Sequence, residues 1–569
     1  MTSTTAAPTK ARTPEEKARH REVLEALSGL LMGMFVAILA GTVVSTSLPR
    51  IISDLKGDQT AYTWVVTSTL LATTVSTPIW GKLADLVNRK VLVQLALVIF
   101  VIGSALAGFS QDTNTLIAFR VVQGLGAGGL TALVQVVMAD IVSPRERGRY
   151  MGLIGAVMAV GTVGGPLIGG LLTDGFGWRW NFYVALPFAV VALVLIQRTL
   201  KLPVRAKRAV SIDYLGAVLI AGGVSLLLIW VSLGGKQFEW ASGTSWVMVG
   251  GAVALLIAAV VTELKVREPI IPMTLFKNRT FVFAVLASLA IGVVLFGTSV
   301  FLSQYLQLAE GHTPTESGLL TLPMVIGLLG TSTVVGGIIS RTGIWKRYVV
   351  AGAILLVVGV TLLGTIRYDT PYWLLAIFML ILGMGLGTTM QNLVLVTQNS
   401  LQASQLGAGS AGIAFFRSLG GTLGVSALGA FLGTRITDLI RDGITALDPA
   451  TAAAAGRALG SGTVPVVSSL PGPIRLIVES AYGEGIGDVF LLAAPLTLIT
   501  LLFVCLLPNR PLGTKTASEQ LAESAEKPGL QADAERALEL GANQIGGTTE
   551  ADRRSDSDDR AAEPVGGRR

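Results

Sequence analysis

The sequence is poor in cysteine, histidine and charged residues. Its 569 residues include one cysteine, Cys505, and two histidines, His20 and His312, and only 14% of the residues are charged. A single cysteine excludes an intrachain disulfide, and this scarcity argues against a Cys/His metal centre. Outside residues 1–26 and 511–569, only about one residue in ten is charged. That density cannot cover the surface of a soluble protein of this size, so a soluble multidomain enzyme is excluded.

Long apolar runs fill the remainder, and 51% of the residues are hydrophobic. A helix needs about 20 apolar residues to cross the hydrocarbon core of a membrane. The first run is too long for a signal peptide and follows a polar segment, which predicts an uncleaved span. The sequence therefore predicts an all-α polytopic membrane protein with fourteen transmembrane helices. The runs are 27–48, 62–80, 91–110, 115–140, 150–173, 178–199, 213–233, 245–263, 280–307, 316–338, 348–366, 373–396, 406–431 and 488–507.

The Lys and Arg residues between the runs predict the orientation. With the N-terminus inside, the inside connections hold 18 basic residues and the short outside loops hold 5. Basic residues concentrate in cytoplasmic loops. Both termini are therefore expected in the cytoplasm, and the Arg-rich, Ala/Gly-rich composition favours a bacterial cytoplasmic membrane.

Two segments depart from the membrane pattern. Residues 432–487 are rich in Ala, Gly, Ser and Pro and predict a long outside loop with a short helix near 436–447. Whether a periplasmic or envelope partner binds this loop is left open. Residues 511–569 are polar and lack a sustained apolar period, which predicts a disordered tail. The predicted parts are a cytoplasmic tail 1–26, a six-helix bundle 27–199, two inserted helices 200–279, a second six-helix bundle 280–507 and a disordered cytoplasmic tail 508–569.

Two pairs of segments repeat along the chain. Residues 81–90, after the second run, and 337–347, after the tenth, both have Gly at the membrane exit, a charged residue four positions later and a basic pair. Residues 161–170 and 420–429 are both rich in glycine. The repeats predict two related halves, an organisation typical of alternating-access transporters that bind substrate between the halves.

The first of these loops is the predicted cytoplasmic gate, with Gly81, Asp85, Arg89 and Lys90, and with Asp140 as a further member. Gly81 allows close helix approach, and a carboxylate among basic residues can hold two bundles together in one state and release them in another. A simple topology anchor is an equal alternative for this loop.

A charged residue lies within the fourth run. Arg120 is followed by Gln123 on the same helical face and by Gly124. An ionisable residue inside a span is a functional hypothesis by default. We predict that these residues couple ion to substrate; snorkelling of Arg120 to the outer interface is the alternative.

The fifth run contains a stripe of small residues. Gly161, Gly165 and Gly169 are spaced by four and share one face, which favours close helix packing. Pro166 removes a backbone hydrogen bond. With Gly170 they predict a hinge, a pliable seam between the halves; static packing is compatible with the same pattern.

Arg417 lies too deep in its run to snorkel easily and is therefore expected to face the substrate cavity. No Asp or Glu lies deep in any run, and the sequence has no Gly-x-x-x-x-Gly-Lys-[Ser/Thr] phosphate-binding loop. We therefore expect no enzyme activity, no metal and no cofactor, and an ion gradient as the energy source. The other predicted lining residues are Trp64, Gln304, Tyr305, Gln391, Asn392 and Phe416.

Together these motifs resemble the major facilitator superfamily, specifically its fourteen-helix drug/proton antiporter family, over residues 27–507. Residues 81–90, 116–129 and 161–170 are similar to its motifs after helix 2, in helix 4 and in helix 5, the last being typical of exporters. The resemblance implies multidrug efflux by proton antiport and, with it, antibiotic resistance. Ala40 stands where helix 1 of the family often has Asp, so the proton-carrying group is not identified.

The predicted function is secondary-active export of amphipathic small molecules, coupled to protons by alternating access. The predicted partners are the lipid bilayer, the substrate and protons, with no nucleic acid. A lipid or natural-product exporter of the same fold is one alternative. A non-transporting membrane sensor or scaffold is another.

Overall fold

The computed structural model describes residues 14–514, with gaps at 57–58, 201–212, 236, 267, 403–404, 446, 448–451 and 453–469, together with Thr516 and Glu519. These residues form helices and connecting turns, without a β-sheet. The elements are α1 Pro14–Asp54, α2 Gln59–Leu86, α3 Arg89–Gly108, α4 Thr113–Ile141, α5 Pro144–Gly175, α6 Trp180–Tyr183, α7 Ala185–Thr199, α8 Tyr214–Leu233, α9 Gly243–Lys265, η1 Met273–Lys277, α10 Arg279–Gln304, η2 Tyr305–Ala309, α11 Pro314–Leu320, α12 Leu322–Thr342, α13 Lys346–Leu363, α14 Tyr372–Ser400, α15 Leu406–Thr445 and α17 Gly472–Leu506.

Within the described residues, twelve helices are long and apolar enough to cross a membrane. The all-α, polytopic prediction is thus confirmed. α2 and α5 cover the predicted runs 62–80 and 150–173 but are not among the twelve, so the number fourteen stays a prediction. α1 already begins at Pro14, so the described part of the predicted N-terminal tail, residues 14–26, is helical.

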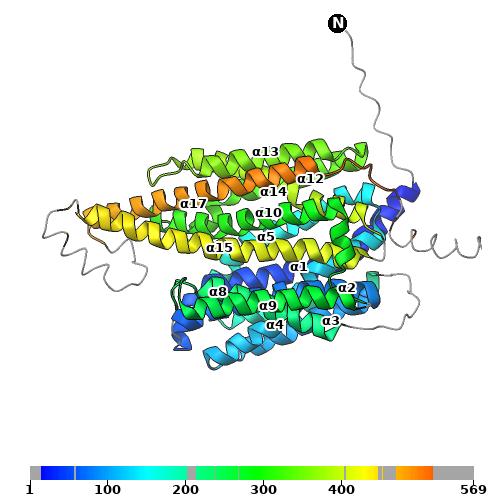
Figure 1. Ribbon diagram of the computed structural model, residues 1–569, viewed down its shortest axis with the longest axis horizontal. Helices are drawn as coiled ribbons and strands as arrows, with labels where there is room; N and C mark the ends of the chain where they lie inside the picture. Colours follow the sequence, from blue (N-terminus) through cyan, green and yellow to red (C-terminus); the bar gives the residue numbers. More distant parts are fainter. Residues whose placement is uncertain are drawn as a thin grey trace, which may run out of the picture. The chain divides into compact units, whose positions relative to one another are not determined.

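The same helix pairings occur twice along the chain. Figure 1 labels the helices concerned. In the N-terminal half, α1 packs on α5, and α2 and α3 pack on α4. In the C-terminal half, α10 packs on α15, and α12 and α13 pack on α14. This order of pairings is the one that a parallel repeat predicts. The halves meet where α2 contacts α15 and where α5 contacts α12.

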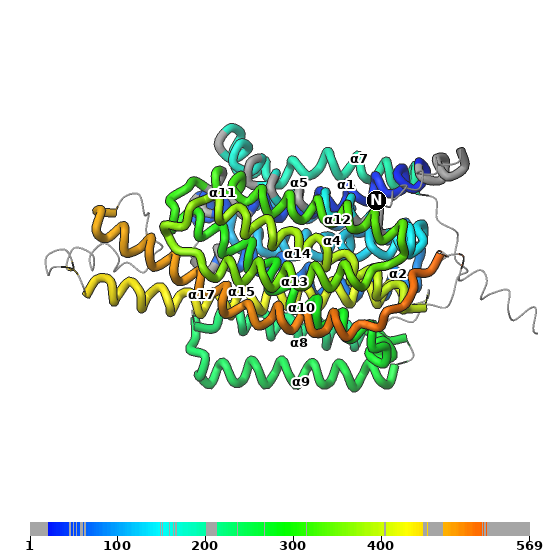
Figure 2. The backbone as a smooth tube through the Cα atoms, turned by 90° about the horizontal axis from the view of Figure 1, so that it is seen from above, coloured from blue at the N-terminus to red at the C-terminus, as the bar shows by residue number. Residues whose placement is uncertain are grey.

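The inserted helices α8 and α9 form a pair beside this bundle. α8 packs on α9 and also contacts α2 and α15. Figure 2 shows α9 at the edge, with α8 between it and the other helices. The insert therefore lies where the two halves meet through α2 and α15.

The predicted outside loop 432–487 is wrong in its bounds, because α15 and α17 continue through most of it as a helical hairpin (Figure 1). Arg435 of α15 joins the helices: its Nη2 lies 3.0 Å from Glu484 Oε1 and its Nε lies 2.8 Å from Asp488 Oδ2. Apolar runs mark only the part of a helix expected in lipid, so they missed a hairpin held by ion pairs. α15 ends at Thr445 and α17 begins at Gly472.

The predicted disordered tail is wrong for residues 508–514, which pack against the end of the C-terminal half. Trp345 Nε1 donates to the Arg510 carbonyl over 2.8 Å. The Gly513 N–H donates to Asn399 Oδ1 over 2.8 Å. These bonds fix a segment that is too polar to form a core of its own. The rest of the predicted tail lies outside the described residues, apart from Thr516 and Glu519.

Candidate functional site

A contact between the halves lies at what we call the basic end, where α2 ends, α5 begins and α15 begins. Asp85, in the last turn of α2, accepts hydrogen bonds from the backbone N–H groups of Gly407 and Ala408, both over 2.9 Å. The first N–H groups of a helix lack intrahelical partners and carry partial positive charge. A Cβ at Gly81 would lie 2.2 Å from Ala411 Cβ. Glycine there lets the two helices approach this closely.

Arg89 holds Asp85 in place. Its guanidinium is buried, with Nη2 3.3 Å from Asp85 Oδ1, and forms an ion pair with Asp140. The Arg89 cation thus pairs with two carboxylates of the N-terminal half. A buried charge needs such a partner of opposite sign. Lys90 instead donates to the Gln197 carbonyl over 2.8 Å, within the same half. The structure brings four of the five predicted gate residues together and leaves Lys90 apart.

A second contact joins the halves through Arg147, which is 1% exposed. Its Nη1 donates to Gln398 Oε1 of α14. Gln398 Nε2 donates to Ser410 Oγ over 2.8 Å and to the Gln135 carbonyl over 3.3 Å. We call the Asp85 and Arg147 contacts the latch. Sequence reasoning missed Arg147, because nothing in the sequence distinguishes it from the exposed Arg145 nearby.

Arg120 forms the predicted pair with Gln123. Arg120 Nη1 donates to Gln123 Oε1 over 2.8 Å, and Nε donates to the Val65 carbonyl of α2 over 3.3 Å. Gln123 Nε2 donates to Ser104 Oγ of α3 over 3.1 Å. In the described part of the chain, no carboxylate forms an ion pair with Arg120. The guanidinium therefore links α2 to α4, and Gln123 extends this link to α3.

Gly124 completes this region at the α2–α4 contact. A Cβ at Gly124 would lie 2.6 Å from the Thr69 carbonyl oxygen of α2. The glycine is therefore needed for the close approach of these two helices. The half-buried Trp64 lies on the same helix α2, next to the carbonyl that Arg120 contacts.

The glycine stripe of α5 packs within one half. Since both α1 and α5 belong to the N-terminal half, the prediction that these residues form the seam between the halves is wrong. Another face of α5 meets α12, where a Cβ at Gly152 would lie 2.9 Å from Thr333 Cα. Gly170 has open space around it, and Pro166 lies within α5. A Cβ at each stripe residue would lie 2.8 Å or less from α1: Gly161 from Ile38, Gly165 from Thr42 and Gly169 from Val43.

A small central cavity of about 70 Å³ lies between the halves and is lined by α5, α10, α12 and α14. Gln391, one of the predicted lining residues, lines this cavity, and its Nε2 lies 3.8 Å from Met158 Sδ across the interface. Gln391 Oε1 is buried without a hydrogen-bond partner. Asn392 donates to the Thr388 carbonyl over 2.7 Å and is buried beside the cavity wall. With the latch formed, the cavity is too small for a drug-sized molecule.

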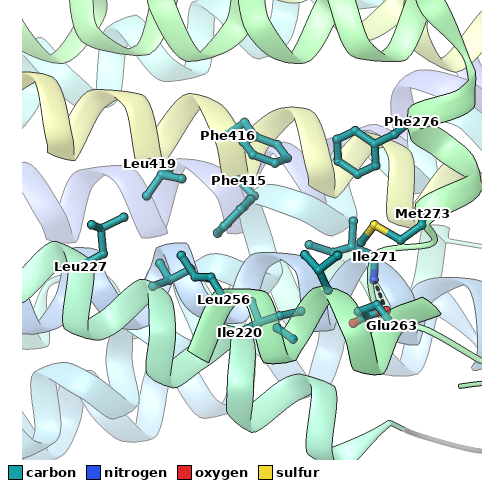
Figure 3. Close-up of a pocket in the computed structure, with 13 residues that line it drawn as sticks. Ile220, Leu227, Leu256, Glu263, Ile271, Met273, Phe276, Phe415, Phe416 and Leu419 are labelled. Atoms are coloured by element: carbon teal, nitrogen blue, oxygen red, sulfur yellow. Dashed lines mark hydrogen bonds between the residues drawn. The ribbon is translucent and has the colours of Figure 1, made fainter. Parts of the chain in front are cut away.

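The remaining predicted lining residues lie elsewhere. Arg417 Nη1 is buried without a hydrogen-bond partner on α15, and its carbonyl packs against Gly292 of α10. Phe416 lines a second cavity, beside the inserted helices (Figure 3). Gln304 ends α10 and is half-buried. None of these three lines the central cavity.

Tyr305 is buried in the core of the C-terminal half. Its hydroxyl donates to the Arg367 carbonyl over 2.6 Å. Glu310, beyond the end of the span, lies 3.3 Å from His312. Burial raises the pKa of Glu310, while the Tyr305 hydroxyl and His312 act in the opposite direction. Because Tyr305 is buried in the core and its hydroxyl binds the Arg367 carbonyl, it has a packing role rather than the predicted place in the substrate cavity.

The structure has two repeated helical halves with an inserted pair of helices. A cavity lies between the halves, and the latch closes one end. These features define a polytopic membrane protein of the transporter class. Residues 30–425 match the profile of the Major Facilitator Superfamily, and the chain belongs to this family.

Similar proteins include named multidrug transporters. The multidrug transporter protein MdtP of Bacillus subtilis is 36% identical over 431 residues, covering 75% of this chain and 78% of MdtP. Multidrug resistance protein 3 of Bacillus subtilis is 31% identical over 486 residues, covering 84% and 94%. Among solved structures, the human organic anion transporter MFSD10 has a TM-score of 0.55 at 15% identity, covering 85% of this chain and 100% of MFSD10. This last likeness concerns the fold alone.

Proposed function

We propose that the protein is a secondary-active exporter of amphipathic small molecules, coupled to protons by alternating access. We place it in a bacterial cytoplasmic membrane with both termini inside. The observation that carries the proposal is the latch, which closes the basic end over a cavity between the halves. The names of the similar multidrug transporters support efflux as the direction.

In the alternating-access cycle, the latch has two states, formed and released. When Asp85 releases α15 and Arg147 releases Gln398, the halves separate at the basic end and the central cavity opens to the cytoplasm. Re-forming the contacts closes that end and favours opening at the other. Arg120 and Gln123, which bridge three helices of one half, would transmit the ion's effect to the substrate. Protons supply the energy, without a cofactor.

Transport in vesicles tests the proposal. Purified protein is reconstituted into liposomes loaded with a fluorescent amphipathic dye, and a pH gradient is imposed across the membrane. We expect dye movement against its gradient, lost when an uncoupler collapses the pH difference. Protein with Arg147→Ala, which removes half of the latch, serves as the inactive comparison. Dye movement that ignores both the gradient and the uncoupler would show that the proton-antiport proposal is wrong.

A further inference from the structure

The segment that follows α17 joins the two halves at the basic end. Residues 508–514, which we call the strap, leave the axis of α17 and turn across the end of the bundle (Figure 2). The Gly513 N–H donates to Asn399 Oδ1 of α14 over 2.8 Å, and the Gly513 carbonyl accepts from the Arg145 N–H of α5 over 3.1 Å. Since α14 belongs to the C-terminal half and α5 to the N-terminal half, Gly513 bridges the halves.

The strap is held mainly by the C-terminal half. Trp345 Nε1 donates to the Arg510 carbonyl over 2.8 Å, and Asn399 Nδ2 donates to the Pro511 carbonyl over 3.0 Å. Leu512 is 8% exposed and packs in the core of that half. Within the described residues, a single hydrogen bond joins the strap to the N-terminal half. If the halves separate, the strap therefore stays with the C-terminal half.

The bond to the N-terminal half is made at a helix end that offers a free donor. Arg145 is the second residue of α5, which begins at Pro144, and the first N–H groups of a helix lack intrahelical partners. The Ser143 side chain accepts from the Glu146 N–H, and the Gly513 carbonyl accepts from the Arg145 N–H. The cap of α5 is thus completed by a residue that the other half holds in place.

The strap lies beside one of the two latch contacts. Arg147 and Gln398, which form that contact, are close neighbours of Arg145 and Asn399 along their helices. The Arg145 side chain adds a long bond across the interface, 3.4 Å from Nη2 to the Arg341 carbonyl of α12, at an exposed position. Moving Arg147 away from Gln398 therefore also moves the Arg145 N–H away from the strap.

We propose that the strap locks the basic end in its closed state and is carried by the C-terminal half when that end opens. Opening breaks the bond between the Gly513 carbonyl and the Arg145 N–H, and water then binds both groups, so neither is left buried without a partner. Asn399 and Trp345 keep the strap in place through the change. This proposal deepens the proposed function and rests on its alternating-access cycle, because it makes the segment after α17 a regulator of how readily the latch opens.

Labelling of a buried thiol tests the strap without transport. In full-length protein with Cys505→Ser, Ala408→Cys places a thiol at the buried start of α15, and a membrane-impermeant maleimide reports opening of the basic end in nanodiscs. Arg145→Pro removes the backbone donor, at a position in the first helical turn where proline is tolerated. Arg145→Ala removes the same side chain but keeps the N–H. We expect labelling about 2- to 10-fold faster in Arg145→Pro than in Arg145→Ala, the range that one hydrogen bond supplies.

Asn399→Ala provides a second route to the same released state, because it removes both bonds of the strap to α14 and leaves α5 unaltered. It should also label faster than the unmodified background, while all variants stay monodisperse on a sizing column. Only faster labelling in both Arg145→Pro and Asn399→Ala supports the proposal. An increase in neither overturns it, and so does an increase in one alone, since Arg145→Pro would then act by distorting α5, or Asn399→Ala by weakening α14. Faster labelling in both, with dye transport that ignores the pH gradient, would leave the strap standing and reject the proposed antiport.

Discussion

At the scale of single residues, the latch depends on one carboxylate that binds backbone rather than a side chain. Asp85 accepts two N–H groups from the first turn of α15, and Arg89 orients it from within its own half. A charged acceptor at a helix N-terminus gains from both hydrogen bonding and the helix dipole. The closed basic end therefore relies on the charge of Asp85.

Asp85→Asn should open the basic end. The amide keeps one acceptor oxygen and loses the charge, a change worth about 1.5–3 kcal/mol for a charge-assisted bond. With Cys505→Ser and Ala408→Cys as background, labelling of the buried Cys by a membrane-impermeant maleimide in nanodiscs should become faster. Asp438→Asn, which alters an exposed pair with Arg441, is the control. Equal labelling rates in the two variants would contradict the role of Asp85.

Arg120→Ala should abolish dye export while the protein stays folded and monodisperse. Arg120→Lys should also fail, because an ammonium cannot reproduce the planar fork that reaches both Gln123 and the Val65 carbonyl. Export in vesicles and elution from a sizing column are the measurements. Arg21→Ala, at an exposed i,i+4 pair, should transport normally. Export at the wild-type rate by Arg120→Ala would exclude a role in coupling.

Contacts between residues close in sequence could be predicted, whereas contacts between distant residues could not. Arg120 and Gln123 are three residues apart on one helical face, so their pairing follows from helix geometry. The contact of Asp85 with Gly407 spans 322 positions and involves backbone, which leaves no pattern of matched side chains.

At the scale of elements, hydropathy predicted where the helices lie but not where they begin and end. The apolar runs mark the parts expected in lipid, so α1, α15 and α17 all extend beyond the predicted spans. The stripe of small residues on α5 correctly predicts a close helix contact. It could not say which helix makes that contact, because both α1 and α12 pack on α5.

Gly165→Ala should destabilise the protein, whereas Gly170→Ala should not. A Cβ at Gly165 would lie 2.0 Å from Thr42 Oγ1, while Gly170 has nothing within 4 Å. Overpacking costs about 1–3 kcal/mol, and alanine in an open helical position is favourable by up to about 1 kcal/mol. Thermal unfolding of the two variants in the same detergent measures the difference. Equal midpoints would show that α1 and α5 are not tightly packed at Gly165.

At the scale of the whole molecule, the segment that directly follows α17, residues 508–514, is part of the fold. Residues 508–514 bind α14 and the start of α13. A chain ending at Thr514 should therefore export dye at the wild-type rate, and one ending at Leu507 should unfold at a lower temperature. Both chains lack the polar tail, so each is the other's control. Loss of export in the chain ending at Thr514 would favour the scaffold alternative.

The contact of Asp85 with the backbone of α15 also limits how the protein can recover from mutation. A gate made of two oppositely charged side chains can be restored by exchanging the charges. Here the partners of Asp85 are two main-chain N–H groups. No substitution can turn these hydrogen-bond donors into a negatively charged group. Second-site revertants of an Asp85 mutant should therefore not be charge reversals on α15. They should arise where other contacts, such as that of Arg147 with Gln398, are strengthened to hold the closed state.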